Sequence, residues 1–166
     1  MKNKESLTET YLIQALIELI EKKPFDKITI TDIAEKAGVS RITFYRHFNS
    51  KTDIIDKKNK SITEECIKKT LIENDAKSIE EYIFYVFNVL FKNKKYLKVL
   101  YKERLDMMIT LDLDKALYKY GTHNTYRRIF YTGGFFNILL EWIKNDFKDD
   151  PKEMVKEIMY ILKQDP

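Results

Sequence analysis

The chain has 166 residues, enough for one or two small domains with a buried core. Hydrophobic residues make up 44% of the sequence, which excludes a disordered protein, and only four glycines and three prolines occur, which favours long helices over a many-stranded sheet. The formal net charge is +4, and residues 41–60 hold six basic side chains against two acidic ones. This basic stretch is typical of a polyanion-binding protein, although a solvated lysine-rich helix face is the alternative.

Cysteine usage and hydropathy indicate the compartment. A single cysteine, Cys66, excludes an intramolecular disulfide framework and favours a reducing environment. Residues 1–6 are polar and no apolar segment of a signal peptide comes after them. No run approaches the roughly 18 apolar residues that cross a bilayer. We therefore expect a cytoplasmic protein with no membrane partner.

The N-terminal fifty residues begin with one amphipathic helix. The spacing of apolar side chains predicts this helix over residues 6–23, ended by Pro24. Phe25, Ile28 and Ile30 then predict a short apolar connector that packs beneath the next elements.

Two short helices come next. Thr31 is predicted to cap a second helix over residues 32–37, and Gly38 to supply a left-handed residue after it. Ser40 is predicted to cap a third helix over residues 41–48. A helix, a glycine turn and a second short helix are the elements of a helix-turn-helix.

The remaining chain is predicted to be helical throughout, which makes the fold class all-α. Ser50 and Asp53 resemble a capping box that starts a long connecting helix over residues 51–72. The boundary is therefore placed between a head of residues 1–50 and a helical body of residues 51–166. Further helical patterns cover residues 78–91, 96–108 and 126–147, a loop is expected at residues 121–124, and Asp150, Pro151 and Glu153 predict the start of a closing helix.

The helix-turn-helix divides its side chains into an inner and an outer set. Small and apolar residues must pack where the two helices cross: Ile33, Ala34, Ala37, Val39, Phe44 and Phe48. The outer set is unusual for an ordinary surface and suits a DNA groove: Arg41, Ile42, Thr43, Tyr45, Arg46 and His47.

Each outer side chain has a chemical partner on a duplex. Arg41 can pair with guanine O6 and N7, and Ile42 can contact a thymine methyl. Tyr45 and His47 can donate to phosphate oxygens, although half-buried packing and a plain surface position are their respective alternatives. Thr43 and Arg46 suit phosphate or base edge.

Helix starts flank this surface on both sides. Lys51, with the free N–H groups at the start of the connecting helix, is expected to bind the flanking phosphate backbone of the DNA. Thr31 lies at a similar helix start, and Thr31, Ser40 and Ser50 are expected to act as caps whatever else they touch.

The same residues resemble a known family. The run from Ile30 to Lys51, and above all Thr-Phe-Tyr-Arg-His-Phe followed by Ser-Lys, closely resembles the DNA-binding signature of TetR/AcrR regulators, with strong resemblance over residues 7–60. The resemblance implies an all-α homodimer that binds palindromic operator DNA, most often as a repressor released by an effector. It makes residues 1–50 the DNA-binding domain and residues 51–166 the regulatory and dimerisation domain. It places these residues at DNA-contact positions: Thr31, Ser40, Arg41, Ile42, Thr43, Tyr45, Arg46, His47 and Lys51.

The C-terminal part resembles short-bodied members of that family. The stretch of residues 131–143, followed by residues 149–154, looks like the last two helices of regulators associated with dihydroxyacetone kinase operons. We carry over the architecture of that subgroup and none of its ligand chemistry.

Two adjacent glycines inside the predicted helix over residues 126–147 suggest a dimer interface. They cost roughly 2 kcal/mol relative to alanine, so they are expected where another helix approaches closely. Closing the monomer's own core is the alternative to a four-helix dimer interface. The expected interface residues are Ile129, Phe130, Gly133, Gly134, Phe136, Leu140, Ile143, Met154, Ile158 and Ile161.

An effector site is less defined. Residues 82–108 are rich in aromatic and methionine side chains, which fits a core or a ligand cavity. Arg104 or His123 suits an anionic or polar inducer, but either is as readily a surface residue. The effector is expected to be small, another protein or absent, and no ligand residues are assigned.

Other classes of function fit the sequence less well than DNA binding. No Gly-rich phosphate loop or metal-ligand spacing occurs, and Cys66 has no neighbouring His, so neither catalysis nor a cofactor is expected. A transcriptional activator or a protein-binding adaptor of the same fold remains the alternative. Acidic residues interleave the lysines of the connecting helix, which weakens a membrane-surface role.

Overall fold

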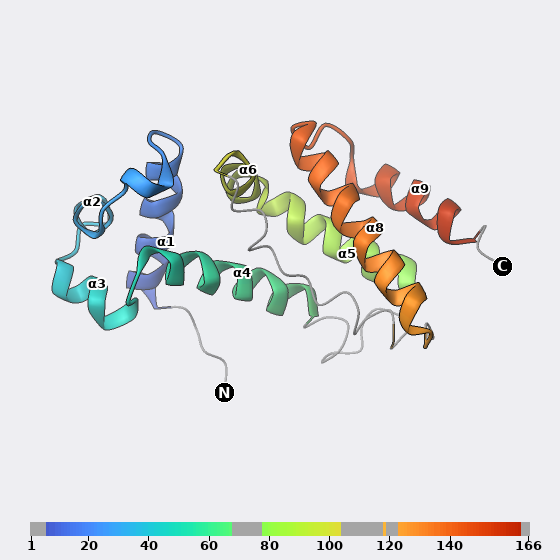
Figure 1. Ribbon diagram of the computed structural model, residues 1–166, viewed down its shortest axis with the longest axis horizontal. Helices are drawn as coiled ribbons and strands as arrows, with labels where there is room; N and C mark the ends of the chain where they lie inside the picture. Colours follow the sequence, from blue (N-terminus) through green and yellow to red (C-terminus); the bar gives the residue numbers. More distant parts are fainter. Residues whose placement is uncertain (1–5, 68–77, 104–117, 119–122, 164–166) are drawn as a thin grey trace.

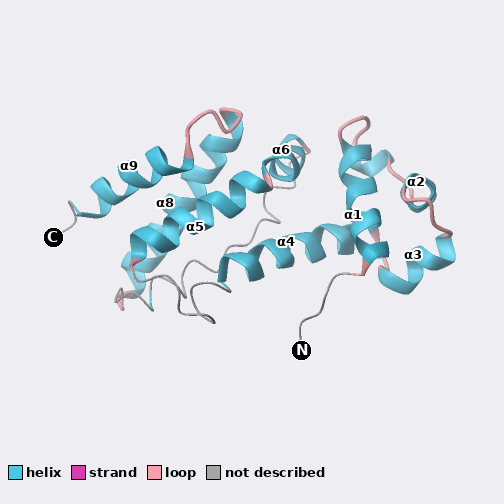
Figure 2. Ribbon diagram, turned by 180° about the vertical axis from the view of Figure 1, so that it is seen from behind, coloured by secondary structure: helices cyan, strands magenta, loops and turns pink. Residues whose placement is uncertain are grey.

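The computed structural model describes residues 6–67, 78–103, 118 and 123–163, and within these ranges every regular element is a helix (Figure 2). The expected all-α fold is confirmed. In chain order the elements are α1 (Leu7–Ile20), the 3₁₀ turn η1 (Phe25–Lys27), α2 (Ile30–Lys36), α3 (Arg41–His47), α4 (Lys51–Ile67), α5 (Ile79–Lys92), α6 (Lys94–Lys102), α8 (Thr125–Lys144) and α9 (Pro151–Lys163).

The elements form two groups joined by α4. In Figure 1, α1, α2 and α3 lie together at one end, and α5, α8 and α9 at the other. Helix α4 packs against both α1 and α5, while α6 contacts α1 on one side and α8 on the other. We call the first group and the start of α4 the head, and we call α5 to α9 the body.

Helix α1 is fixed at its start by a reciprocal cap. Ser6 Oγ accepts the Glu9 N–H at 3.2 Å, and Glu9 Oε2 accepts the Ser6 N–H at 3.0 Å. These bonds satisfy two donors that the first turn leaves free. The helix ends at Ile20, three residues before the predicted end, and its apolar face is buried in the core.

The predicted start of the second helix was wrong. Thr29, not Thr31, is its N-cap: Thr29 Oγ1 accepts the Asp32 N–H at 3.1 Å, and Asp32 Oδ2 accepts the Thr29 N–H at 2.7 Å. Lys23 adds an ion pair to Asp32 at 2.8 Å, and these bonds hold the pKa of the Asp32 carboxyl well below its usual range. A Thr and an Asp three residues apart form a capping box, which outweighs the cap predicted for Thr31.

The head and the body share direct polar contacts through α6. The buried Tyr96 hydroxyl donates to Asn59 Oδ1 at 2.7 Å. The same hydroxyl oxygen lies 3.2 Å from the Ile55 carbonyl oxygen. The Glu103 carboxylate accepts the Phe25 N–H at 2.9 Å, which ties the end of α6 to η1. Burial raises the pKa of the Tyr96 hydroxyl, so it stays a donor.

The core of the body is built around one tryptophan. Trp142 stacks on Phe91 with ring centroids 5.8 Å apart, and the rings of Phe87 and Phe147 lie 5.4 and 4.7 Å away. Trp142 Nε1 donates to the Asp149 carbonyl at 3.0 Å, so its polar atom is satisfied. Several of the aromatic side chains predicted to form core or cavity therefore lie in the core; Met107 and Met108 lie outside the described residues.

The chain reverses sharply between α8 and α9. The predicted helix over residues 126–147 ends at Lys144, and Asp146 and Phe147 have φ of 63° and 56°. Two consecutive left-handed residues without glycine are strained, so neighbouring contacts must hold them. The Phe147 N–H donates to the Trp142 carbonyl at 2.8 Å, and the buried Phe147 ring packs in the Trp142 cluster.

Candidate nucleic-acid interface

The turn between α2 and α3 has the predicted glycine geometry. Gly38 has φ of +71°, where a side chain would be strained. The Val39 N–H donates to the Ala34 carbonyl at 2.9 Å and the Gly38 N–H to the Glu35 carbonyl at 3.1 Å, which is a Schellman motif. The predicted left-handed turn is confirmed.

Four of the six residues in the inner set of the helix-turn-helix are buried as predicted, and Ala37 and Val39 are partly buried. Ile33 and Phe44 are fully buried, and Ala34 and Phe48 are nearly so. The Phe44 ring contacts the ring of Tyr45 edge-on at 5.5 Å. Because this core fixes the rotation of α3 about its axis, it decides which side chains the helix turns outward.

The outer face of α3 is exposed. Ile42 keeps 70% of its surface exposed and Tyr45 keeps 49%, while Arg41 and Arg46 are also exposed. An isoleucine this exposed buries little apolar surface within the chain and is accessible to a partner outside it.

Ser40 caps α3 as predicted. Its Oγ accepts the Thr43 N–H at 3.1 Å and lies 3.0 Å from Thr43 Oγ1. One of these hydroxyls donates to the other. The second hydroxyl proton is not used in this bond and can be donated to an acceptor outside the chain.

His47 and Lys57 gather around one carboxylate. His47 Nδ1 lies 3.8 Å and Lys57 Nζ 3.9 Å from Glu9 Oε1, and the other oxygen of Glu9 caps α1. Glu9 therefore positions two cationic or donor side chains beside α3. From the sequence, Lys57 belongs only to a basic stretch, and this arrangement was missed because the contact joins residues far apart in the chain.

Lys51 is held by the head itself. Its Nζ donates to the Phe25 carbonyl at 2.7 Å and to the Ile28 carbonyl at 3.0 Å, and it lies 4.5 Å from the centre of the Phe25 ring. An ammonium has three donors, so one remains for a phosphate. The role of Lys51 in locking η1 against α4 was not visible from the sequence.

The start of α4 is capped as the sequence predicts. Ser50 Oγ accepts the Asp53 N–H at 3.1 Å, and Asp53 Oδ2 accepts the Asn49 N–H at 2.9 Å. The Ser50 hydroxyl also donates to Asp53 Oδ1 at 2.5 Å, and this bond and the one from the Asn49 N–H lower the pKa of the Asp53 carboxyl below its usual range. Thr31, by contrast, is exposed in the first turn of α2 without a capping role.

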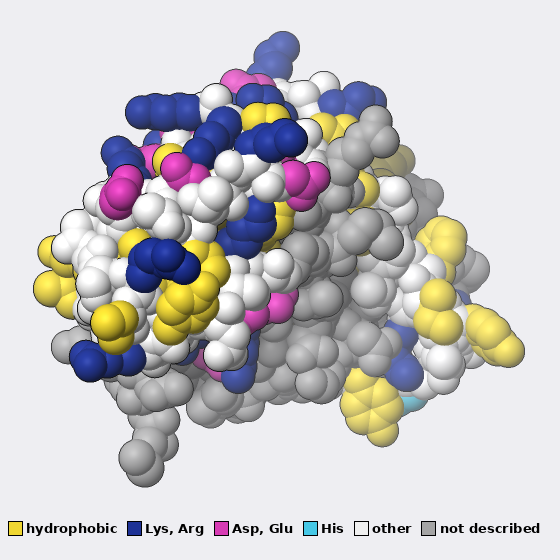
Figure 3. Space-filling model, turned by 60° about the vertical axis from the view of Figure 1, so that its left-hand side comes forward, with side chains coloured by type: hydrophobic (Ala, Val, Ile, Leu, Met, Phe, Trp, Pro, Cys, Tyr) yellow, Lys and Arg dark blue, Asp and Glu magenta, His cyan; other side chains and the backbone are white. Residues whose placement is uncertain are grey.

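Figure 3 brings the end of the molecule that carries α2 and α3 forward. Lysine and arginine side chains lie there beside hydrophobic ones, with acidic side chains between some of the basic ones. A surface that pairs positive charge with exposed apolar groups can neutralise phosphates and contact bases in a groove.

The expected interface residues on α8 and α9 fall into two groups. Ile143 and Ile158 are buried in the chain's own core, which corrects their assignment to a dimer interface. Ile129, Phe130 and Ile161 instead keep 62%, 75% and 59% of their surface exposed. The remaining positions are exposed or half-buried: Gly133, Gly134, Phe136, Leu140 and Met154.

The two glycines of α8 have no close neighbour. A Cβ added at Gly133 or Gly134 would meet nothing within 4 Å among the described residues. Within that part of the chain, no helix therefore explains why these positions lack side chains.

The expected effector contacts are not brought together. His123 is exposed and packs edge-on against the exposed Tyr118 at 4.8 Å, and Arg104 lies outside the described residues. In the part of the chain that the structure covers, no three metal-ligating side chains converge. The described helices also include none long and apolar enough to cross a membrane.

Two family models together span most of the sequence. Residues 12–57 match the model described as bacterial regulatory proteins, tetR family, and residues 77–164 match a transcriptional regulator C-terminal region associated with the same family. The chain belongs to the TetR family. The resemblance predicted from residues 30–51 is thereby confirmed.

Curated relatives match a short part of this chain. A HTH-type transcriptional regulator of Bacillus subtilis, YvdT, is 48% identical over 44 residues, which are 26% of this chain and 23% of that protein. The nucleoid occlusion factor SlmA of a Marinomonas species is 38% identical over 56 residues, which are 34% of this chain and 28% of that protein. The matched segment thus spans about a quarter of these relatives.

Solved structures match the whole fold. The dihydroxyacetone kinase operon activator DhaS aligns with a TM-score of 0.67 over 94% of each chain at 14% identity. The fatty acid degradation regulator FadR from Bacillus halodurans aligns with a TM-score of 0.66 over 96% of each chain at 20% identity. At these identities the likeness shows the fold of a TetR-family regulator, with a helix-turn-helix head and a helical body.

Proposed function

We propose that this TetR-family regulator is a homodimer that reads a palindromic operator with two copies of α3. The observation that carries the proposal is the outer face of α3, where Ile42 and two arginines are exposed above a fully buried Phe44. A helix of this length and composition fits the major groove.

The proposed contacts divide by type. Arg41, in the first turn of α3, reads guanine, and the exposed Ile42 meets a thymine methyl. Tyr45 and His47 donate to phosphate oxygens and fix the register of the helix on the duplex. Ser40, Thr43 and Arg46 add phosphate or base contacts.

The edges of the interface lie at the flanking helix starts. Thr31 is exposed at the first turn of α2, and Lys51 keeps one donor beyond its two carbonyl partners. We assign both to phosphates on either side of the groove.

Dimerisation supplies the second recognition helix. The exposed Ile129, Phe130 and Ile161, together with two glycines that meet no neighbour among the described residues, support a second copy packed on α8 and α9. Small residues let helices approach closely, and the apolar side chains around them would then be covered.

Repression is the proposed sign of regulation, because a dimer bound across a promoter excludes the polymerase. DhaS is described as an activator, so activation by the same fold is the second candidate. A small molecule or a partner protein is proposed to release the DNA, and the site of action is the cytoplasmic nucleoid.

Selection of bound duplexes from random DNA tests the function directly. We expect a palindrome whose half-sites are spaced by about one helical turn or a multiple of it. Arg41→Ala should reduce the preference for one base pair per half-site by roughly 1–3 kcal/mol. Tyr45→Phe should weaken binding to all sequences alike. A folded dimer that binds no duplex at low salt would overturn the proposal, and a reporter gene behind the selected site gives the sign.

A further inference from the structure

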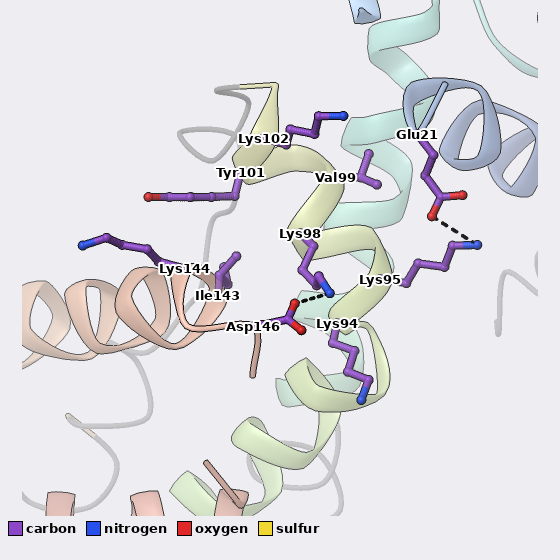
Figure 4. A pocket seen from close by; sticks show the side chains of 10 residues that line it. All are labelled: Glu21, Lys94, Lys95, Lys98, Val99, Tyr101, Lys102, Ile143, Lys144 and Asp146. Carbon is purple, nitrogen blue, oxygen red and sulfur yellow. Dashed lines mark ion pairs between the residues drawn. The ribbon is translucent and has the colours of Figure 1, made fainter. Parts of the chain in front are cut away.

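A lysine-rich groove lies where the end of the head meets the body. It is open to solvent, encloses a volume of about 550 Å³, and is formed by the end of α1, by α6 and by the end of α8 with the turn after it (Figure 4). The lining residues are Glu21, Lys94, Lys95, Lys98, Val99, Tyr101, Lys102, Ile143, Lys144 and Asp146.

The groove carries an excess of positive charge. Five lysines line it against two carboxylates, and each carboxylate already has a partner: Glu21 pairs with Lys95 at 3.3 Å, and Asp146 pairs with Lys98. Lys144 pairs with Glu141, outside the lining, at 3.2 Å. Figure 4 shows Lys144 and Tyr101 extending in the same direction from the two facing helices. Lys102 forms no ion pair with any of the described residues, and its side chain is exposed.

This charge arrangement opposes the stability of α6. Lys94, Lys98 and Lys102 follow one another at four-residue spacing, where like charges repel. Lys94 and Lys95 also stand at the positive end of the helix dipole, with no acidic residue in the first turn. The Asn93 side chain forms no cap hydrogen bond at this end, and its Nδ2 donates to the Val89 carbonyl at the end of α5. A bound anion would relieve each of these unfavourable terms.

We propose that this groove binds a small polyanion that carries two or more phosphate or carboxylate groups. Its volume falls in the range of sites for small ligands, and a duplex is too wide to enter it. Lysines are flexible point charges that suit phosphate oxygens. The half-buried Tyr101 offers an aromatic face for an apolar part of the same ligand.

The groove also touches the contacts that join head and body. Glu21 is the C-cap residue of α1 in the head, and Lys95 belongs to α6. A polyanion competes with Glu21 for Lys95 and with Asp146 for Lys98, which changes the seating of α6 against α1. This step rests on the proposed DNA-binding function and makes the groove a site that regulates it.

Calorimetry of the full-length protein tests the binding site without DNA. Pyrophosphate should bind about tenfold more tightly than inorganic phosphate. Lys98→Gln combined with Lys102→Gln should weaken pyrophosphate about tenfold or more, whereas Lys163→Gln on α9, which removes one charge elsewhere, should leave it unchanged.

Removing a negative charge from the groove gives a second test of the site. Asp146→Asn should tighten pyrophosphate binding about threefold, because it removes a competing carboxylate while asparagine tolerates the left-handed backbone. Equal affinity in all of these variants would overturn the site.

Titration of the operator complex tests the regulatory step. Pyrophosphate should change operator affinity at least threefold in the parent protein and not in the double lysine variant. If the double variant loses operator affinity without pyrophosphate and its salt dependence flattens, the groove contacts DNA and the proposal is wrong. If pyrophosphate binds but no duplex does, the groove stands and the DNA-binding function fails.

Discussion

The head and the body of this chain differ in how fully they bury their apolar side chains. In the head, the starts of the helices are closed by Ser6, Thr29 and Ser40, and the core side chains are buried within one chain. The body also has capped helices, yet α8 turns Ile129 and Phe130 to the surface. The core of the head is thus complete within one chain, whereas the exposed face of α8 is where we propose that a second copy packs.

The largest effect should come from the core of the head. Phe44→Ala removes a fully buried ring and should lower the free energy of unfolding by about 3–5 kcal/mol. Urea unfolding followed by circular dichroism measures this loss. Tyr45→Ala removes a neighbouring ring that is half exposed, and it serves as the control, with a much smaller loss expected. Equal losses would mean that α3 is not packed through Phe44.

Disrupting the face of α8 should act on association instead of folding. Phe130→Glu places a charge on a side chain that is 75% exposed in the single chain, so the monomer should stay folded while the dimer dissociates. Sedimentation over a range of concentrations measures the change. Tyr11→Glu alters an exposed aromatic on α1 as the matched control. A dimer that persists in Phe130→Glu would place the interface elsewhere.

Lys51 combines a contribution to stability with a proposed contact to DNA. Lys51→Gln removes a charged donor to two carbonyl groups and should lower the free energy of unfolding by about 1–3 kcal/mol. If its remaining donor also binds a phosphate, the slope of log affinity against log salt should fall by about 1. Denaturation and binding titrations separate the effects. A stability loss without a change of slope would leave Lys51 purely structural.

The smallest effect concerns pH and the caps of the head. The ion pair with Lys23 and the bonds to Thr29 lower the pKa of Asp32, and a bond and charge from Lys36 lower the pKa of Glu18 from 4.5 to about 2. A carboxyl with a lowered folded pKa stabilises the fold above its unfolded pKa and loses that contribution as pH falls toward the folded one. Urea midpoints should therefore fall as the pH is lowered from 4.5 to about 2.

Asp32→Asn provides the comparison for this pH dependence. It removes the charge at the α2 cap while keeping a side-chain acceptor, so the slope of stability against pH should become shallower. Asp149→Asn, at an exposed position that forms no ion pair within the described part of the chain, should leave the slope as it is. The same slope in both variants would mean that the Asp32 carboxylate contributes nothing to the head.

The sequence predicted the helix-turn-helix well because its signals are local. Gly38 and Ser40 act within three or four residues of their partners, so spacing alone identifies them. Thr31 was misjudged for the opposite reason, since two threonines compete near one Asp32 and only the backbone geometry decides between them.

Other features depend on contacts between distant segments. An apolar helix face does not say which chain covers it, so Ile143 and Ile158 looked like interface residues although they pack internally. The left-handed turn at Asp146 and Phe147 contains no glycine, so the sequence does not predict it. The groove lysines come from α6 and α8, which only the fold brings together.

The polar ties between α6 and the head have a consequence for the geometry of the operator. Tyr96 bonds to Asn59 of α4, and Glu103 accepts the Phe25 N–H of η1, so a swing of the head relative to the body has to break or strain these bonds. A dimer joined through its bodies then presents its two reading helices at one separation and one angle. An extra base pair between half-sites moves one half-site by about 3.4 Å and turns it by about 35°, so we expect the proposed dimer to bind such an operator more weakly.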